Sequence, residues 1–353
     1  MRSRTSPAVL TTLLFAACSG GGDAPSGPTP PAACTFFNPV APGADPWVVR
    51  HEGAYYLVES TGEGIDVHRS ERLTEPKRNG VRIWTSPDTG WNATNVWAPE
   101  LHLIDGRWYV YYAAGRSGPP YVAQRAGVLR SVGADPQGAY EDLGQLDTGG
   151  DPATRADDVW AIDLTVGRVN GQLYAAWSGW EANAATDRPP QHLYVAPMSS
   201  PTAIGAARVR ISSPVESWER GTELDLQEGP TFLQRGADVF LVYSTRESWL
   251  PDYRLGLLRL TGADPLQPAS WTKSPGPVFT RTTTVHGPGH ASFTTSPDGS
   301  EPWMLFHAKT STAPGWDRVI RAQEFSWNAD GTPNFGTPLS AGQAQERPAG
   351  ECQ

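Results

Sequence analysis

The stretch Gly106-Arg-Trp-Tyr-Val-Tyr-Tyr112 places a turn residue directly before an alternating, aromatic-rich run. A run of this kind is typical of a β-strand that leaves a tight turn. Similar stretches begin at Gly53, Gly171, Gly236 and Gly299. These glycines recur every 53 to 65 residues, which is a period typical of propellers and other repeat folds. The chain is therefore predicted to repeat one β unit five times.

A second apolar strand follows each of these stretches, so the repeat unit is predicted to be multi-stranded. The second strands are Val67-His-Arg-Ser70, Val128-Leu-Arg-Ser131, Leu193-Tyr-Val-Ala196, Leu257-Leu-Arg-Leu260 and Val319-Ile-Arg-Ala322. The 37 Gly and 33 Pro supply many turns and disfavour long helices, while 14 Trp and 11 Tyr favour strands. We predict an all-β fold, a five-bladed β-propeller with four-stranded blades, over residues 34–353.

The first residues have the composition of an export signal. Arg2 and Arg4 precede an apolar run, residues 8–17, that is too short to span a bilayer. The run ends in Phe-Ala-Ala before Cys18, which resembles the cleavage box of bacterial lipoproteins. We expect residues 1–17 to be a lipoprotein-type signal peptide and Cys18 to be acylated, with simple secretion as the alternative. Residues 18–33 are rich in Gly, Pro and Ser and are expected to form a tether.

Two further cysteines, Cys34 and Cys352, stand at the two edges of the predicted folded region. An exported protein lies where disulfides persist, so these cysteines are expected to pair. The alternative is a free thiol at each end, because the sequence does not show whether the ends meet.

Residues at equivalent repeat positions converge on the central channel of a propeller. Counting eight residues back from the first four turn glycines gives Asp45, Ala98, Asp163 and Glu228, and nine back from the fifth gives His290. Three of these five positions are acidic, and each acid lies beside or within an apolar strand, where a charge is costly to bury. A structural explanation also exists for Asp45, because Asp-Pro commonly starts a turn. For His290 the residues alone favour an ordinary buried imidazole over a functional role.

Hydrolysis of a glycosidic bond usually takes two carboxyl groups, an acid that protonates the leaving oxygen and a partner that activates water or attacks the sugar. The acid needs a raised pKa, which burial or a neighbouring carboxylate provides. The three acids at equivalent repeat positions fit this chemistry.

Trp97, one residue before the Ala98 position, is expected either to pack within its blade or to stack on a sugar. A net charge of -9 without a basic cluster disfavours a nucleic-acid partner.

Five motifs, in order along the chain, resemble those of glycoside hydrolase family 43. They are Asn38-Pro-Val40 with Gly43-Ala-Asp-Pro-Trp47, Val96-Trp-Ala-Pro-Glu-Leu-His102, Trp160-Ala-Ile-Asp163, Glu228-Gly-Pro-Thr231 and Gly287-Pro-Gly-His290. The resemblance spans about residues 38 to 340 and implies an inverting mechanism. It makes Asp45 the general base, Asp163 the residue that tunes the acid's pKa, and Glu228 the general acid. It also implies that His290 helps to hold a calcium or sodium ion in the channel through water. No cofactor is expected to be required for the chemistry.

Within the family, α-L-arabinofuranosidases are the nearest resemblance, through Trp177-Ser-Gly-Trp-Glu181 and Trp327-Asn-Ala-Asp-Gly-Thr-Pro333 among other segments. The expected activity is release of terminal L-arabinofuranose from arabinan, arabinoxylan or their oligosaccharides. β-Xylosidase and endo-arabinanase activities on the same fold are alternatives. A non-catalytic carbohydrate-binding propeller would not need the three acids, and the motifs of fructan-active five-bladed enzymes are not found. Leu164 departs from the family pattern, where a small residue is expected beside the acid.

Overall fold

The computed structural model describes residues 34–149 and 158–352. The predicted signal peptide, the acylated Cys18 and the tether lie outside the described residues. Within the described ranges, no helix is long and apolar enough to cross a membrane.

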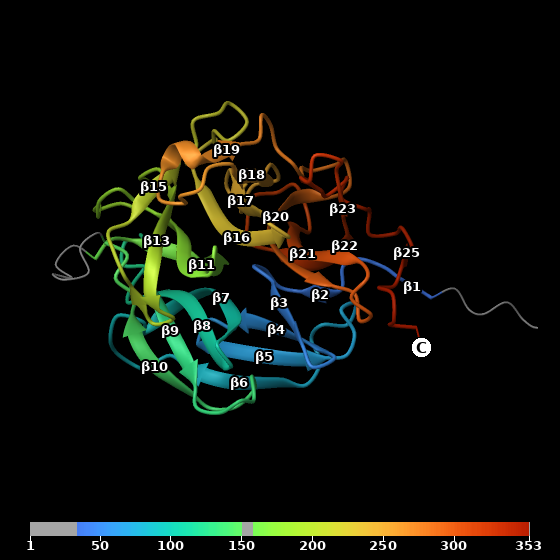
Figure 1. The fold of residues 1–353 in the computed structure, drawn as a ribbon, viewed down its shortest axis with the longest axis horizontal. Coiled ribbons are helices and arrows are strands. Elements are labelled where there is room, and N and C mark those ends of the chain that lie inside the picture. The colour runs from blue at the N-terminus through green and yellow to red at the C-terminus, as the bar shows by residue number, and fades with distance from the viewer. Residues whose placement is uncertain (1–33, 150–157, 353) are drawn as a thin grey trace, which may run out of the picture. The chain divides into compact units, whose positions relative to one another are not determined.

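Residues 34–149 and 158–352 form an all-β propeller, and its five antiparallel sheets follow one another along the chain (Figure 1). In each blade the first strand lies nearest the centre of the ring in Figure 1. Blade 1 contains β3 (Trp47–His51), β4 (Ala54–Ser60), β5 (Gly64–Ser70) and β6 (Gly80–Thr85), and blade 2 contains β7 (Thr94–Ile104), β8 (Arg107–Gly115), β9 (Arg125–Ser131) and β10 (Tyr140–Gln145). Blade 3 contains β11 (Ala161–Val169), β12 (Gln172–Gly179), β13 (His192–Ser200) and β15 (Val209–Ser212), with β14 (Ala203–Ile204) also paired to β13. Blade 4 contains β16 (Gln227–Arg235), β17 (Asp238–Thr245), β18 (Arg254–Leu260) and β19 (Trp271–Lys273), the last preceded by the 3-10 turn η1 (Pro268–Ser270).

The fifth blade is completed by the start of the chain. Its inner strands are β20 (His286–Thr295), β21 (Pro302–Lys309) and β22 (Arg318–Glu324), and its outer strand is β2 (Ala41–Pro42). A further pair joins β1 (Thr35–Phe36) to β25 (Gln345–Glu346), and β23 (Ser326–Trp327) pairs with β24 (Pro333–Asn334). The ring is therefore closed by backbone hydrogen bonds between sequence-distant segments, which the sequence analysis did not anticipate.

The two terminal cysteines meet beside this closure. The Cα atoms of Cys34 and Cys352 lie 6.0 Å apart, and the structure pairs their sulfurs. That Cα separation is within the range that disulfides span. The bond stays a prediction until its thiols are measured.

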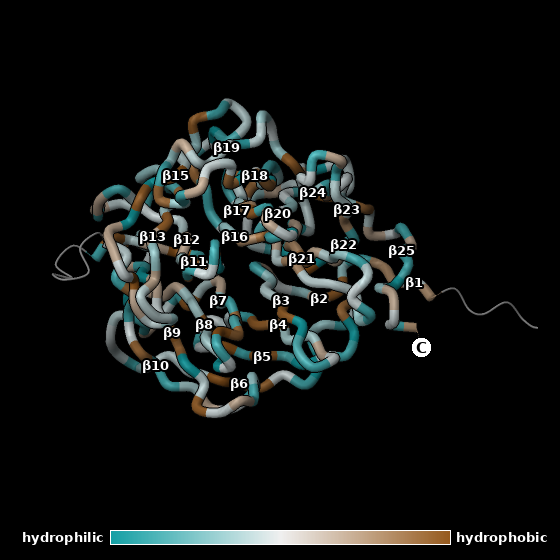
Figure 2. Tube along the Cα trace, viewed as in Figure 1, coloured by the Kyte–Doolittle hydropathy of each residue, from teal (hydrophilic) through white to brown (hydrophobic). Residues whose placement is uncertain are grey.

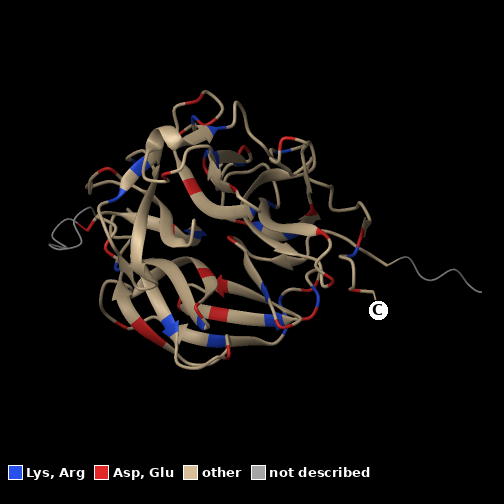
Figure 3. Cartoon of the chain, viewed as in Figure 1, with Lys and Arg blue, Asp and Glu red and all other residues tan. Residues whose placement is uncertain are grey.

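Five apolar clusters fill the five interfaces between neighbouring blades. Val58 of blade 1 and Val110 of blade 2 belong to one cluster, and Leu305 of blade 5 shares another with Leu57 of blade 1. The remaining interfaces are filled in the same way. Figure 2 shows the corresponding apolar segments within the strands, and Figure 3 shows acidic and basic residues scattered over all the blades. Because each cluster joins two adjacent sheets, burial of apolar surface holds the innermost strands around the channel.

Leu164 belongs to one of these interfaces and not to the channel wall. Its side chain is buried in the cluster between blades 2 and 3, together with Tyr111 and Trp177. The residue that departs from the family pattern beside Asp163 therefore packs between two blades.

Candidate active site

Most of the innermost strands carry a bulge at the same level of the ring. The pairing of the first strand with the second is interrupted between Trp97 and Glu100, Ile162 and Thr165, Glu228 and Thr231, and Gly289 and Ser292. The first residue inside each interruption has a left-handed backbone, with φ of 40° at Ala98, 55° at Asp163, 54° at Gly229 and 50° at His290. Asp45, just before β3, has a φ of 48°. Such backbone conformations are uncommon for residues other than glycine and concentrate at functional sites.

This pattern corrects the repeat alignment at Glu228. In blade 2 the residues before and after the turn are Ile104 and Arg107, so Gly106 is the second turn residue. In blade 4 the turn lies between Arg235 and Asp238, so the turn glycine, Gly236, is the first turn residue. Counting eight residues back from Gly236 therefore lands one residue early. Gly229 is the structural equivalent of Asp163, and Glu228 is equivalent to Trp97.

The structure nevertheless brings the predicted residues together. Asp45, Asp163, Glu228, Trp97 and His290 all line one cavity of about 700 Å³. This volume lies within the range usual for small-molecule sites.

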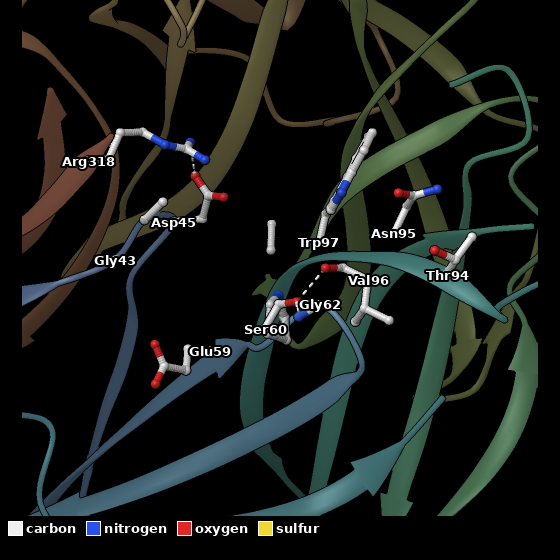
Figure 4. Close-up of a pocket in the computed structure, with 13 residues that line it drawn as sticks. Gly43, Asp45, Glu59, Ser60, Gly62, Thr94, Asn95, Val96, Trp97 and Arg318 are labelled. Atoms are coloured by element: carbon white, nitrogen blue, oxygen red, sulfur yellow. Dashed lines mark hydrogen bonds and ion pairs between the residues drawn. The ribbon is translucent and has the colours of Figure 1, made fainter. Parts of the chain in front are cut away.

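Asp45 is held by three cationic or polar side chains. Its Oδ1 atom lies 3.1 Å from Nη1 of Arg318, 3.0 Å from Nδ1 of His307 and 3.3 Å from Nδ1 of His290. Figure 4 shows the Arg318 guanidinium reaching the Asp45 carboxylate. Burial acts to raise the pKa of Asp45, but these neighbours together hold it well below its usual value. Asp45 is thus an ionised carboxylate at any ordinary pH.

Asp163 is buried, with 4% of its surface exposed, and is fixed to the neighbouring blade. Its Oδ2 atom accepts a hydrogen bond of 2.9 Å from the backbone N–H of Gly229. Burial, assisted by the charges of Glu228 and Asp45, raises the pKa of Asp163 to about 7, while His290 and the Gly229 N–H oppose the rise. The charge of Glu228 therefore acts on Asp163, and the Asp163 carboxylate is hydrogen-bonded to Gly229, the residue that follows Glu228.

Glu228 lies in a desolvated position. Burial is the main cause that raises its pKa to about 7, and the charge of Asp45 adds to the rise. Tyr253, Arg318 and Ser248 act in the opposite direction and favour the ionised form. Because burial raises the pKa values of both Asp163 and Glu228 to about 7, the two carboxyl groups form a coupled pair that loses a proton near neutral pH.

His307 and Tyr253 were not among the predicted site residues. His307 is fully buried on β21, and its Nδ1 accepts a hydrogen bond of 3.1 Å from the backbone N–H of Asp45. Burial lowers the pKa of His307 to about 4, so the ring is neutral. The Tyr253 ring stacks on it, with centroids 5.3 Å apart. A Cβ atom at Gly289 would lie 2.3 Å from the Tyr253 ring, so the glycine makes room for this stack.

A recognisable signal was present for His307 and not for Arg318. His307 interrupts the apolar run Trp303–Phe306, much as Asp163 interrupts its own strand. Arg318 follows a loop, and only its place beside Asp45 in the folded ring identifies it.

Aromatic side chains form much of the cavity wall. Trp97 is half-buried and packs edge-on against Tyr121, with ring centroids 5.1 Å apart. Trp160 stacks on Trp180, with ring centroids 4.5 Å apart, and also lines the cavity. The cavity is also lined by polar side chains that were not among the predicted site residues, namely Asp187, Arg188, Gln191 and Glu223.

A second hollow adjoins the first between blades 1 and 2. It has a volume of about 450 Å³ and shares Asp45, Trp97 and Arg318 with the main cavity (Figure 4). Glu59 lines its far side. Glu228 lines only the main cavity.

The donor set for an ion at His290 is limited. His290 Nδ1 points toward Asp45, and no group of three His, Cys, Asp or Glu side chains among the described residues is arranged to hold a metal. Direct protein ligands for an ion are therefore not assembled in this part of the chain, and no chemical step is assigned to one.

A carboxylate kept ionised, a buried acid with a raised pKa and a third carboxylate beside that acid share one sugar-sized cavity, as expected of a glycoside hydrolase. Residues 36–333 match the model of the glycosyl hydrolases family 43, so the chain belongs to that family. The resemblance recognised in the sequence motifs is confirmed.

The sequences of individual relatives align with most of this chain. It is 38% identical to the "Extracellular exo-alpha-(1->5)-L-arabinofuranosidase" of Streptomyces avermitilis, over 90% of this chain and 67% of that protein. It is 34% identical to "Alpha-L-arabinofuranosidase 43" of Humicola insolens, over 86% of this chain and 63% of that protein. The match thus spans about two thirds of the length of these two relatives. The crystal structure of an α-L-arabinofuranosidase from Lactobacillus brevis superposes with a TM-score of 0.78 at 30% identity, covering 87% of this chain and 98% of that one. Such neighbours confirm the predicted propeller.

Proposed function

We propose that this chain is an inverting α-L-arabinofuranosidase that releases terminal L-arabinofuranose from arabinan, arabinoxylan or their oligosaccharides. The observation that carries the proposal is that Asp45, Asp163 and Glu228 line one cavity, where the Arg318 guanidinium lowers the pKa of Asp45 and burial raises the pKa of Glu228 to about 7. The names of relatives that are 38% and 34% identical support the choice of sugar.

In the proposed reaction Glu228 donates its proton to the glycosidic oxygen as the bond from that oxygen to the anomeric carbon breaks. Water attacks the anomeric carbon from the opposite face, and Asp45 accepts the proton that this water loses. Asp163 accepts the Gly229 N–H beside Glu228 and is proposed to carry the negative charge of the pair, so that Glu228 holds the proton. Solvent then restores both carboxyl groups, and the sugar leaves with inverted configuration.

The stereochemical outcome tests the mechanism. With a water between base and sugar, the carboxyl groups of Asp45 and Glu228 should stand roughly 6.5–9.5 Å apart and the first product should be the inverted anomer. Proton NMR of the initial product distinguishes the two cases. Detection of the retained anomer would contradict the role of Asp45, because an attacking carboxylate would then be required at about 5 Å from the acid.

β-Xylosidase and endo-arabinanase activities are the competing functions on the same fold. Aryl α-L-arabinofuranoside, aryl β-D-xyloside and linear arabinan separate them. We expect cleavage of the arabinofuranoside and release of single arabinose units from arabinan. Preferential cleavage of the xyloside, or release of arabinan fragments without free arabinose, would replace the proposed activity. No cleavage of any of the three would favour a carbohydrate-binding role.

We also propose that the protein is exported, in keeping with the word "extracellular" in the names of two Streptomyces relatives. Acylation of Cys18 would tether it to the bacterial cell envelope, and otherwise it would be secreted. Its partner is then arabinose-containing plant polysaccharide. A hydrated calcium or sodium ion near His290 remains part of this proposal as a structural element only. Globomycin treatment of an expressing bacterium tests the anchor, since it blocks lipoprotein processing and should leave an unprocessed precursor.

A further inference from the structure

Two tryptophans from different blades meet at the rim of the main cavity. Trp249 follows β17 in blade 4, and Trp316 precedes β22 in blade 5. Their ring centroids lie 5.3 Å apart at an angle of 49°. Trp316 is 60% exposed, and the other exposed large apolar side chains among the described residues do not line the cavity. Two paired indoles that line the cavity, one of them exposed, offer an aromatic face on which a sugar ring can stack.

The loop that carries Trp316 is anchored. The backbone N–H of Gly315 donates to the carbonyl oxygen of Trp249 over 3.0 Å, and Nζ of Lys309 donates to the carbonyl oxygen of Gly315 over 2.5 Å. The Arg318 guanidinium lies 5.4 Å from the centre of the Trp316 ring. The exposed ring is therefore held in place before any ligand arrives, which lowers the entropic cost of binding.

The position of the general acid shows which sugar would contact these rings. Glu228, Ser248 and Trp249 line the same cavity, and Ser248 favours the ionised form of Glu228. The proposed acid must touch the leaving oxygen, so the leaving sugar passes beside Ser248 and Trp249. The second hollow lies instead on the Asp45 side and is not lined by Glu228. The tryptophan pair thus lies on the leaving-group side of the site.

We propose that Trp316, supported by Trp249, is a stacking site for the sugar ring to which the arabinose is attached. The carbon–hydrogen face of a neutral furanose or pyranose would lie on the Trp316 indole. This inference rests on the proposed function, because it assumes that Glu228 is the acid. It makes Trp316 a determinant of leaving-group specificity and not a catalytic residue.

The test compares two substrates whose leaving groups are both poor but differ in having a ring. The leaving group of arabinotriose is arabinobiose, which has sugar rings, whereas the leaving group of methyl α-L-arabinofuranoside is methanol. For Trp316→Ala we expect kcat/KM on arabinotriose to fall about tenfold, with less than a twofold change on the methyl glycoside. Trp316→Phe, which keeps an aromatic face, should recover most of the lost rate.

An equal loss on both substrates would overturn the proposal. If that loss came with a shift of the acid limb of the pH profile, it would show that Trp316 acts through Arg318 on Asp45. Failure of the proposed function is distinguishable, because the wild-type protein would then cleave neither substrate. In that case the stacking site is tested by binding alone. Arabinotriose is titrated into Glu228→Gln protein, and its binding is measured by the quenching of tryptophan fluorescence. Quenching that Trp316→Ala leaves unchanged would contradict the stacking site.

Discussion

The carboxylate of Asp163 is hydrogen-bonded, over 2.9 Å, to the backbone N–H of Gly229, the residue that directly follows Glu228. Blade 3 thereby fixes the position of a carboxyl group on blade 4. The charge of Glu228 raises the pKa of buried Asp163, whereas the hydrogen bond from Gly229 lowers it, so this contact acts on both the position and the ionisation of the pair.

Asp163→Asn separates these two effects. The amide oxygen still accepts the Gly229 N–H, but the negative charge beside Glu228 is gone. Without that charge the pKa of Glu228 should fall, so the alkaline limb of the kcat/KM profile should move to lower pH. We expect the rate at pH 7 to fall roughly 10²-fold, within the range of general acid catalysis.

A pH profile of the folded Asp163→Asn protein checks this expectation. Asp163→Ala serves as the comparison, since it removes the hydrogen bond as well and should lose more activity. A profile for Asp163→Asn with an unmoved alkaline limb would mean that Asp163 has only a positional role.

The wild-type profile should be asymmetric. Loss of the proton shared by Asp163 and Glu228 should set an alkaline limb near pH 7, because burial raises both pKa values to about 7. Asp45 should stay ionised well below pH 4, since Arg318 and its histidine neighbours lower its pKa. Activity is therefore expected to persist into acid solution as far as the fold survives.

Arg318→Gln should alter this acid limb. Removing the guanidinium raises the pKa of Asp45, so protonation should inactivate the enzyme at a higher pH than in the wild type. Arg168→Gln is a suitable control, because Arg168 pairs with Asp105 at an exposed site. An acid limb that is the same in Arg318→Gln as in the wild type would contradict the assignment of Asp45 as the base.

The fold could be predicted from the sequence because each repeat is recognised by short patterns of neighbouring residues. A turn residue, an alternating strand and a second strand recur five times, and each depends mainly on neighbours in the chain. The catalytic acids followed from the same repeat, although Gly236 occupies a different turn position and displaced the alignment of Glu228 by one residue.

What the sequence did not predict depends on contacts between distant segments. Arg318 and His307 reach Asp45 across more than 260 residues, at the seam where β2 joins β22. The Trp249 and Trp316 pair likewise arises from loops of two blades. Loop residues carry no periodic signal, so only the closed ring shows their role.

The pairing of Cys34 with Cys352 is testable by thiol titration. The unfolded, unreduced mature protein should show no reactive thiol from these two cysteines, and reduction should expose both. In the chain-entropy model so long a loop contributes roughly 6 kcal/mol, less any native strain. Cys34→Ser should therefore lower the free energy of unfolding, measured by denaturant titration. Two reactive thiols per unreduced chain would exclude the bond.

The last prediction concerns the division of labour between Glu228 and Asp45. Glu228 is proposed to protonate the departing oxygen, which matters only for a poor leaving group. A nitrophenolate leaves readily without a proton, whereas the alkoxide of a sugar does not. Glu228→Ala should therefore lose roughly 10²–10⁴-fold in rate on arabino-oligosaccharides and far less on nitrophenyl α-L-arabinofuranoside.

Asp45→Ala should behave differently, because without its base the enzyme activates water for neither substrate. Its rates on the two substrates should fall together while water attack is the limiting step. Both variants are measured on both substrates, with circular dichroism showing that each remains folded. An equal loss for Glu228→Ala, together with leaving-group dependence for Asp45→Ala, would mean that the acid is Asp45 and the base is Glu228. The low pKa of Asp45 argues against that reversal, because a carboxyl group that is already ionised has no proton to donate.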